Sequence, residues 1–206
     1  MTTETRPRLS RDDWTAEALR ALTESGLTAV AIEPLALRLG ATKGSGYWHF
    51  ANRAALVEAT LLRWEREHTE QVIAVTKRTG DPMLSIRELF IMSMHSDGPQ
   101  STELALLAAA ADPLVGAALR RVTERRTAYL AELFAEAGFA AEPARQRALL
   151  AYTSYLGHAH LARIAPDQLF TGADLERYLD ATLASLLDGS TDAPTERPPG
   201  STAGGG

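Results

Sequence analysis

The chain is divided into apolar segments with helical spacing, and glycine or proline follows almost every segment. Trp14, Ala18 and Leu22 recur at four-residue steps, and Gly26 follows them. Asp-Pro pairs at 81–82 and 112–113 each supply an N-cap side chain and a first helical residue that needs no N–H partner. No segment of useful length alternates apolar and polar residues with a period of two, so we predict no strands. The expected fold is all-α, with about nine helices.

Each expected helix is bounded by a capping residue or a helix breaker. Ser10 and Asp13 have the spacing of a capping box at the first helix. The expected segments run from about Ser10 to Gly26, Ile32 to Leu39, Lys43 to His49, Arg53 to Arg78, Pro82 to Gly98, Ser101 to Ala111, Pro113 to Gly138, Pro143 to Pro166 and 173 to 187.

The composition is that of a globular protein that does not cross a membrane. Of its 206 residues, 45% are apolar and 23% are charged. The longest apolar run, Leu104 to Ala111, has eight residues, whereas a membrane helix needs about 20. The N-terminus has arginines without an apolar stretch behind them, so we expect no secretory signal and a cytoplasmic location. Residues 1–9 and 189–206 are predicted to be disordered tails. Residues 189–206 are rich in Gly, Pro, Ser and Thr, a composition that is typical of disorder.

Charge is distributed unevenly along the chain. The net charge is −5, which argues against general affinity for nucleic acid. Residues 34–57 nevertheless contain no acidic side chain, and Arg38, Lys43, His49 and Arg53 lie among them. This window indicates a local surface that faces an anion, although on charge alone chance explains it equally well.

Residues 32–49, IEPLALRLGATKGSGYWH, have the spacing of a helix-turn-helix. Gly40 allows a sharp turn, and Thr42 can cap the second helix. That helix carries hydrogen-bond donors and flat aromatic side chains, the types that contact phosphates and base edges in a major groove. The pattern is only moderately specific, since many helical hairpins contain a glycine turn and aromatic residues are often core residues.

The stretch LALRLGATKGSGYWHFANRAAL extends this pattern into a more specific motif. Residues 10–64 resemble the DNA-binding domain of TetR/AcrR-family transcriptional regulators. The resemblance implies that the second helix of the motif contacts bases or phosphates, and that Thr42 and Arg53 hold phosphates at helix N-termini. The implied DNA-binding residues are Thr42, Lys43, Gly44, Ser45, Tyr47, Trp48, His49 and Arg53. For Trp48 a packing role is equally open, and Phe50 is expected to pack.

The motif departs from the family pattern at three positions. Gly46 stands where the family usually has a large apolar residue. Either Trp14 or Trp48 fills the space beside it, or the short helix frays without DNA; we expect fraying. Ala31 cannot cap the helix expected from Ile32 to Leu39, and Glu33 places an acidic group in the first turn of that helix, near the expected phosphate contacts.

The resemblance assigns residues 65–188 to a regulatory domain, a helical bundle that binds a small effector and dimerises. The candidate pocket residues combine apolar bodies with polar tips; they are Phe90, Met94, His95, Leu107, Tyr129, Tyr152 and Tyr155. Each of them, taken alone, is more simply explained as core. Arg120, Arg121, Arg125 and Arg126 form a basic run that we interpret as a solvated face, with the entrance for an anionic ligand as the alternative.

Two helices, near 143–164 and 173–187, are expected to form the dimer interface, as they do in the family. The stripe Ala144, Ala148, Ala151, Tyr155 and Ala162 lies on one side of the first, and Leu149, Leu150, Tyr152 and Leu156 lie on the other. Because a helix that is apolar on two sides needs two partners, we expect Ala151 to lie in this interface.

The predicted function is that of a homodimeric repressor that binds a pseudo-palindromic DNA operator and is released by an unidentified small molecule. We predict no enzyme activity, catalytic residue or cofactor, since the chain has no cysteine, no phosphate-binding glycine loop and no clustered histidines. His158 and His160 point to different helix faces, so we predict no metal site. The alternative is a helical small-molecule-binding protein whose DNA binding is weakened or lost, and Gly46 is its best support.

Overall fold

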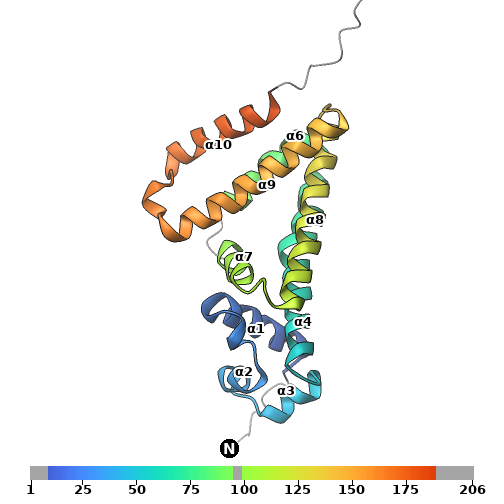
Figure 1. Ribbon diagram of the computed structural model, residues 1–206, viewed down its shortest axis with the longest axis vertical. Coiled ribbons are helices and arrows are strands. Elements are labelled where there is room, and N and C mark those ends of the chain that lie inside the picture. Colours follow the sequence, from blue (N-terminus) through green and yellow to red (C-terminus); the bar gives the residue numbers. More distant parts are fainter. Residues whose placement is uncertain (1–8, 95–98, 189–206) are drawn as a thin grey trace, which may run out of the picture.

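The computed structural model describes residues 9–94 and 99–188, without the side chains of residues 94 and 99–101, and it confirms the all-α prediction. Within these residues there is no strand. The α-helices are α1 (Arg11–Ser25), α2 (Ile32–Leu39), α3 (Lys43–His49), α4 (Arg53–Glu65), α5 (Gln71–Thr76), α6 (Pro82–Met94), α7 (Pro99–Ala108), α8 (Pro113–Glu136), α9 (Ala141–Ile164) and α10 (Gly172–Leu187). The molecule is elongated, with α1–α3 at one end and α10 near the other (Figure 1).

The predicted helix starts are formed by the predicted capping residues. Ser10 and Asp13 make the capping box, with the Asp13 N–H donating to Ser10 Oγ over 3.1 Å. Asp81 Oδ1 accepts from the N–H groups of Met83 and Leu84, and Asp112 caps α8 in the same way. These caps satisfy N–H groups that the helices themselves leave free.

The predicted long helix from Arg53 to Arg78 is interrupted. A π-helical turn, Arg66–Glu70, separates α4 from α5, and a 3-10 turn, Lys77–Thr79, follows α5. With α4 and α5 counted as one interrupted helix, the described residues contain nine helices, as expected. The extra residue of a π turn redirects the side chains that follow it. Thr69 is thereby buried, and it lies against α8, where Arg126 donates to its hydroxyl.

The N-terminal end of the molecule has its own core. Trp14, Leu35, Phe50, Leu56 and Trp64, from α1, α2, α4 and the α3–α4 connection, are buried there. Burial of such side chains contributes roughly 1.5–3 kcal/mol each. Residues of α7 and the first half of α8, including Leu106, Val115 and Val122, complete the same core. The first core is therefore shared with helices that lie beyond residue 64.

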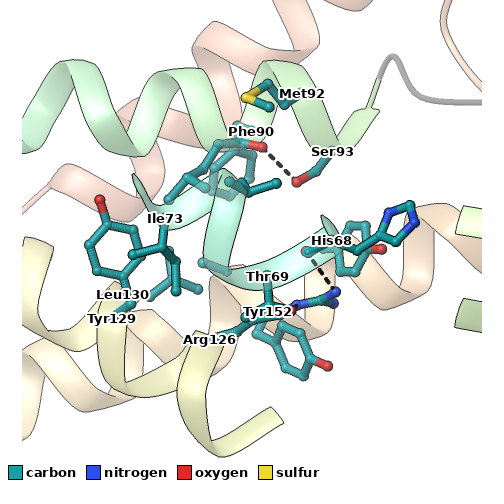
Figure 2. Close-up of a pocket in the computed structure, with 14 residues that line it drawn as sticks. His68, Thr69, Ile73, Phe90, Met92, Ser93, Arg126, Tyr129, Leu130 and Tyr152 are labelled. Carbon is teal, nitrogen blue, oxygen red and sulfur yellow. Dashed lines mark hydrogen bonds between the residues drawn. The ribbon is translucent and has the colours of Figure 1, made fainter. Parts of the chain in front are cut away.

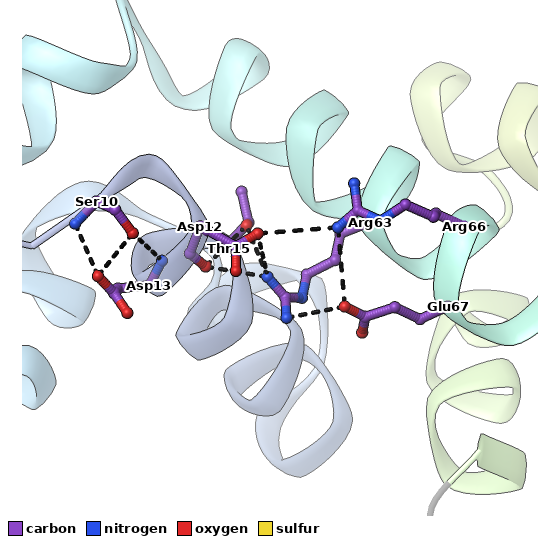
Figure 3. A network of polar contacts seen from close by, with 7 residues as sticks. All are labelled: Ser10, Asp12, Asp13, Thr15, Arg63, Arg66 and Glu67. Carbon is purple, nitrogen blue, oxygen red and sulfur yellow. Dashed lines mark hydrogen bonds and ion pairs between the residues drawn. The ribbon is translucent and has the colours of Figure 1, made fainter. Parts of the chain in front are cut away.

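A polar network ties the start of α1 to the end of α4. Arg63 donates to the Asp12 carboxylate over 2.8 Å and pairs with Glu67 over 2.8 Å (Figure 3). Arg66 lies 3.8 Å from the same Asp12 oxygen. Because the Arg63 side chain is mostly buried, these bonds hold α1 in a defined position on the helix that leads into the π turn.

A second core joins α5, α6, α8, α9 and α10. Helices α8 and α9 pack along each other, and α10 lies across the far end of the bundle (Figure 1). Ile86, Phe134 and Ala148 are buried where α6, α8 and α9 meet, and Leu179 and Leu183 close this core from α10. The four buried leucines of α10 lie on one face of that helix.

Candidate DNA-binding surface and effector pocket

The turn between α2 and α3 has the geometry that its sequence predicts. Gly40 is left-handed, with φ 61° and ψ 33°, a conformation that glycine adopts without steric penalty. Thr42 Oγ1 accepts from the Ser45 N–H over 3.2 Å and so caps α3. No side chain caps α2 at Ala31, as expected. Residues 32–49 therefore form a helix-turn-helix.

The space beside Gly46 is filled, which contradicts the expectation that α3 frays for lack of packing. Gly46 is buried, and a Cβ placed on it would lie 2.6 Å from Ile32 Cγ2 and 2.8 Å from Trp14 Cη2. The indole of Trp14 takes the place of the large residue that the resemblance led us to expect here. The helix is thus packed through α1, a long-range contact that the local sequence of α3 does not encode.

The outer face of α3 presents several of the residues proposed to bind DNA. Thr42, Lys43, Gly44, Tyr47 and Trp48 are exposed, whereas Ser45 and His49 are partly buried. Trp48 is 68% exposed and its ring meets that of His49 edge-on at 4.7 Å. An exposed indole on a short helix is poorly explained by packing within the chain. This surface offers one cation, aromatic faces and hydroxyl groups to a partner.

One carboxylate lies against the cation of this surface. The Tyr47 hydroxyl donates to Glu33 Oε1 over 3.1 Å, and Lys43 Nζ lies 4.0 Å from the same oxygen. The hydrogen bond to Glu33, followed by its negative charge, raises the pKa of Tyr47. Glu33 therefore positions Tyr47 and partly neutralises Lys43.

Two of the proposed DNA contacts also hold neighbouring segments. His49 Nε2 lies 2.9 Å from the carbonyl oxygen of Leu9, before α1. Arg53 donates to the carbonyl oxygens of Val30 over 2.9 Å and Leu27 over 2.7 Å. Both carbonyls precede α2, so Arg53 fixes the start of the helix-turn-helix to α4.

A cavity of about 150 Å³ lies between α5, α6, α8 and α9. It is lined by His68, Thr69, Val72, Ile73, Leu89, Phe90, Met92, Ser93, Arg126, Tyr129, Leu130, Ala151, Tyr152 and Tyr155. The segment with Thr69 and Ile73 crosses the view in Figure 2, with Phe90 on one side of it and Tyr152 on the other. An apolar cavity with a few polar groups is the usual form of a small-molecule site.

Four of the seven proposed pocket residues line this cavity, namely Phe90, Tyr129, Tyr152 and Tyr155. Leu107 does not line it and is 42% exposed on α7. His95 and the side chain of Met94 lie outside the described residues. Sequence reasoning missed His68, Thr69 and Arg126. The π turn brings the first two to the cavity, and a helical pattern in the sequence does not reveal such a turn.

A buried polar cluster adjoins the cavity. Arg126 Nη1 donates to Glu103 Oε2 over 2.7 Å, and the hydroxyls of Tyr152 and Tyr155 each donate to Glu103 over 3.3 Å. Burial, and then the charge of Glu103, raise the pKa of Tyr155. Burial is the largest single effect on the pKa of Arg126 and lowers it, but the charge of Glu103, the two tyrosines and the hydrogen bond to Glu103 together outweigh burial, so the pKa is raised. Arg126 is thus not part of a solvated basic face, while Arg121 and Arg125 pair on the surface with Glu65 and Glu70.

The apolar surface of α9 differs from the stripe expected to form the dimer interface. Ala144, Ala148, Ala151 and Ala159 are buried within the chain, so the assignment of Ala151 to a surface is wrong. The large apolar residues exposed on α9, α10 and their connection are Leu149, Leu150, Leu161, Ile164, Phe170 and Tyr178. The rings of Phe170 and Tyr178 lie 5.3 Å apart. Large apolar side chains exposed in this number on two helices and their connection favour a protein–protein contact.

The part of the chain that the structure describes has neither a cluster of metal-ligating side chains nor a membrane-spanning helix. Nowhere in residues 9–94 and 99–188 do three or more His, Asp or Glu side chains gather as a metal site would require. None of the helices in these ranges combines the length and apolar character of a membrane span.

Comparisons with known proteins agree with this geometry. Residues 15–60 match the family described as bacterial regulatory proteins, tetR family, which confirms the resemblance seen in the motif. No curated protein matches the chain.

Several solved structures share the fold over most of the chain. A transcriptional regulator from Rhodococcus sp. Rha1 has a TM-score of 0.71 and 21% identity, covering 88% of this chain and 97% of the other. Reduced NemR from E. coli has a TM-score of 0.70 and 19% identity, with coverages of 85% and 94%. SmeT, the repressor of the Stenotrophomonas maltophilia multidrug efflux pump SmeDEF, has a TM-score of 0.61 and 21% identity, with coverages of 86% and 90%.

Proposed function

We propose that this chain, whose residues 15–60 match the tetR family of bacterial regulatory proteins, is a homodimeric transcriptional repressor released by a small molecule. Two copies of α3 enter successive major grooves of a pseudo-palindromic operator. The described chain carries the parts that such a regulator needs: a helix-turn-helix, an internal cavity and an apolar surface far from the DNA-binding end.

The single observation that carries the DNA-binding proposal is the outer face of α3. Gly46 of α3 is packed against α1, whereas Lys43, Tyr47 and Trp48 are exposed. The proposed roles are a phosphate contact for Lys43 and groove contacts for Tyr47, Trp48 and Ser45. Thr42 and Gly44 lie in the first turn, where backbone N–H groups can meet a phosphate. His49 supports α3 through its contact with the carbonyl oxygen of Leu9. Arg53 supports it through its bonds to the carbonyl oxygens of Val30 and Leu27.

The cavity supports regulation by an effector. A ligand that prefers a conformation in which the two α3 helices no longer match the half-site spacing lowers DNA affinity by its difference in binding free energy. We propose Phe90, Tyr129, Tyr152 and Tyr155 as ligand contacts. The direction of regulation follows SmeT, whose fold is similar and which is described as a repressor.

The alternative function is a helical ligand-binding protein that has lost DNA binding. Its best support was the glycine at position 46, but the packing of Trp14 against Gly46 removes the reason to expect a defective α3. We propose no enzymatic role for the chain.

A mobility-shift experiment separates the two functions. The full chain is titrated onto the DNA upstream of its own gene and onto a scrambled duplex of equal length. We expect a sequence-dependent shift that the double variant Lys43→Ala/Tyr47→Ala abolishes while its thermal unfolding stays the same. Equal binding to both duplexes, or none, would favour the alternative.

A further inference from the structure

We infer that the effector is a small aromatic carboxylate whose carboxyl group exchanges with Glu103 as the partner of Arg126. This inference rests on the proposed function, because it names the ligand class and the regulation of the same cavity. It draws on the charge of the cavity wall, the size of the cavity and the contacts of Glu103.

The charge of the cavity wall favours an anion. Of the 14 residues drawn around the cavity in Figure 2, Arg126 carries a permanent charge and none is an Asp or Glu. His68 is held neutral, since burial and then Arg126 lower its pKa. A cationic ligand would face an arginine without a carboxylate on the wall, whereas an anionic ligand can pair with this arginine in place of Glu103.

The contacts of Arg126 favour a carboxylate in particular. Its Nε donates to Thr69 Oγ1 over 3.0 Å and its Nη2 donates to the carbonyl oxygen of His68 over 3.1 Å. These two bonds fix the guanidinium plane at the cavity wall, while Nη1 holds Glu103. Glu103 is held through the single charge-assisted bond from Nη1, so a ligand carboxylate that accepts from Nη1 reproduces what Glu103 supplies and leaves no buried cation unpaired.

The size and lining of the cavity favour one ring. A cavity of about 150 Å³ in an apolar core accommodates a single benzene ring. Phe90, Ile73 and Leu130 provide apolar contacts, and Tyr152 adds an aromatic face. We therefore expect the ring to lie among these side chains with its carboxyl group toward Arg126.

Displacement of Glu103 from Arg126 by the ligand can be transmitted to the DNA-binding end through α7. Glu103 is 1% exposed and anchors α7 to α8 and α9 through Arg126, Tyr152 and Tyr155. Its neighbour Thr102 has its hydroxyl oxygen 2.6 Å from that of Thr23 on α1, and α7 packs against α1. Glu103 displaced from Arg126 keeps only the two tyrosine hydroxyls, which do not balance a buried negative charge, so we expect α7 to shift and its contact with α1 to change.

The binding experiment compares three probes of nearly equal shape on the full chain: benzoate, benzamide and benzylamine. Isothermal titration should show benzoate binding at least tenfold more tightly than either of the other two. Glu103→Gln removes the competing charge and keeps an acceptor for the tyrosine hydroxyls, so it should bind benzoate about tenfold more tightly than the wild type.

Loss of the arginine completes this test. Because Arg126→Met alone leaves the buried charge of Glu103 without its counter-charge and so destabilises the bundle, the double variant Arg126→Met/Glu103→Gln is used, with its fold checked by circular dichroism. This variant should lose benzoate binding. Equal binding of the three probes, or no benzoate binding by either the wild type or Glu103→Gln, overturns the inference.

The regulatory step is tested by DNA binding with and without benzoate. Benzoate should weaken DNA binding by the wild type, and Thr102→Val, which removes the hydroxyl that meets Thr23, should reduce this effect with little change in benzoate affinity. An unchanged effect in Thr102→Val would overturn the route through α7. If the protein without ligand binds DNA but not benzoate, the inference fails and the proposed function stands; if it binds benzoate but no DNA, the proposed function fails.

Discussion

Trp14 of α1 lies directly against Gly46 of α3, and its Cη2 atom would be 2.8 Å from a Cβ at that position. Trp14 is completely buried, so its ring cannot turn away into solvent. The pair therefore joins α1 to the helix that we propose to contact DNA, and a glycine in the middle of α3 is what allows the ring to approach so closely.

A methyl group at position 46 should destabilise the domain. Gly46→Ala gains up to about 1 kcal/mol of helix propensity but forces Trp14 and Ile32 to move, and overpacking of this kind costs about 1–3 kcal/mol. We expect a lower melting temperature. The control is Gly44→Ala in the same helix, where the nearest atom would be 3.8 Å away, so this change should raise the melting temperature. A more stable Gly46→Ala would show that the space is not filled.

Removal of the negative charge at Glu33 should tighten DNA binding. Glu33→Gln keeps an acceptor for the Tyr47 hydroxyl but no longer neutralises Lys43 across 4.0 Å. Since the gain is electrostatic, it should be several-fold at low salt and shrink as salt screens the charges. Fluorescence anisotropy with a labelled duplex at two salt concentrations measures it. A loss of affinity would mean that the Glu33 charge is needed to position Tyr47.

Lys43 and Arg53 should differ in what their removal changes. Lys43→Ala should weaken binding to any duplex, flatten the salt dependence by about one unit and leave stability unchanged. Arg53→Ala loses the bonds to Val30 and Leu27, and should lower stability by about 1–3 kcal/mol. Arg120→Ala, an exposed cation on α8, is the control for both effects. Identical stability of Arg53→Ala and the wild type would contradict the supporting role.

Local signals predicted most of the helices, because caps and breakers act within a few residues. Thr42, Asp81 and Asp112 cap helices as their positions predict. The packing of Gly46 could not be read in this way, since Trp14 reaches it from 32 positions away in the chain.

The pocket was predicted less completely for a physical reason. The π turn at Arg66–Glu70 shifts the register of the side chains after it, and it places Thr69 and His68 at the cavity without changing the apolar pattern. Arg126 belongs to a run of four arginines whose different environments cannot be distinguished from the sequence pattern. The buried contacts with Glu103, Thr69 and the His68 carbonyl distinguish Arg126 from Arg125, which pairs with Glu70 at the surface. The sequence of α9 indicates two apolar faces. Packing against α8 decides which of them is buried in the core of the chain, and the sequence of α9 alone does not show this.

The exposed apolar face of α9 should hold the proposed dimer together. Leu150→Arg places an unpaired charge there and should yield monomers in light scattering, with loss of operator binding because the two half-sites are no longer bound together. Leu62→Arg is a matched control on α4, because Leu62 is 52% exposed and Leu150 56%. A Leu150→Arg protein that stays dimeric would place the interface elsewhere.

His68 should make the stability of the chain depend on pH below neutrality. Its pKa in the folded chain is lowered from about 6.5, first by burial and then by the charge of Arg126, so the unfolded chain binds the proton more readily. This contribution to stability is complete above pH 6.5 and is lost as the pH falls toward the lowered pKa. Between pH 7.5 and 5.5 the wild type should therefore lose melting temperature more steeply than His68→Gln, whose side chain does not titrate. Any loss of packing in His68→Gln lowers its melting temperature at every pH, so the comparison uses the slope. Parallel slopes for the two proteins would show that His68 is not the titrating group.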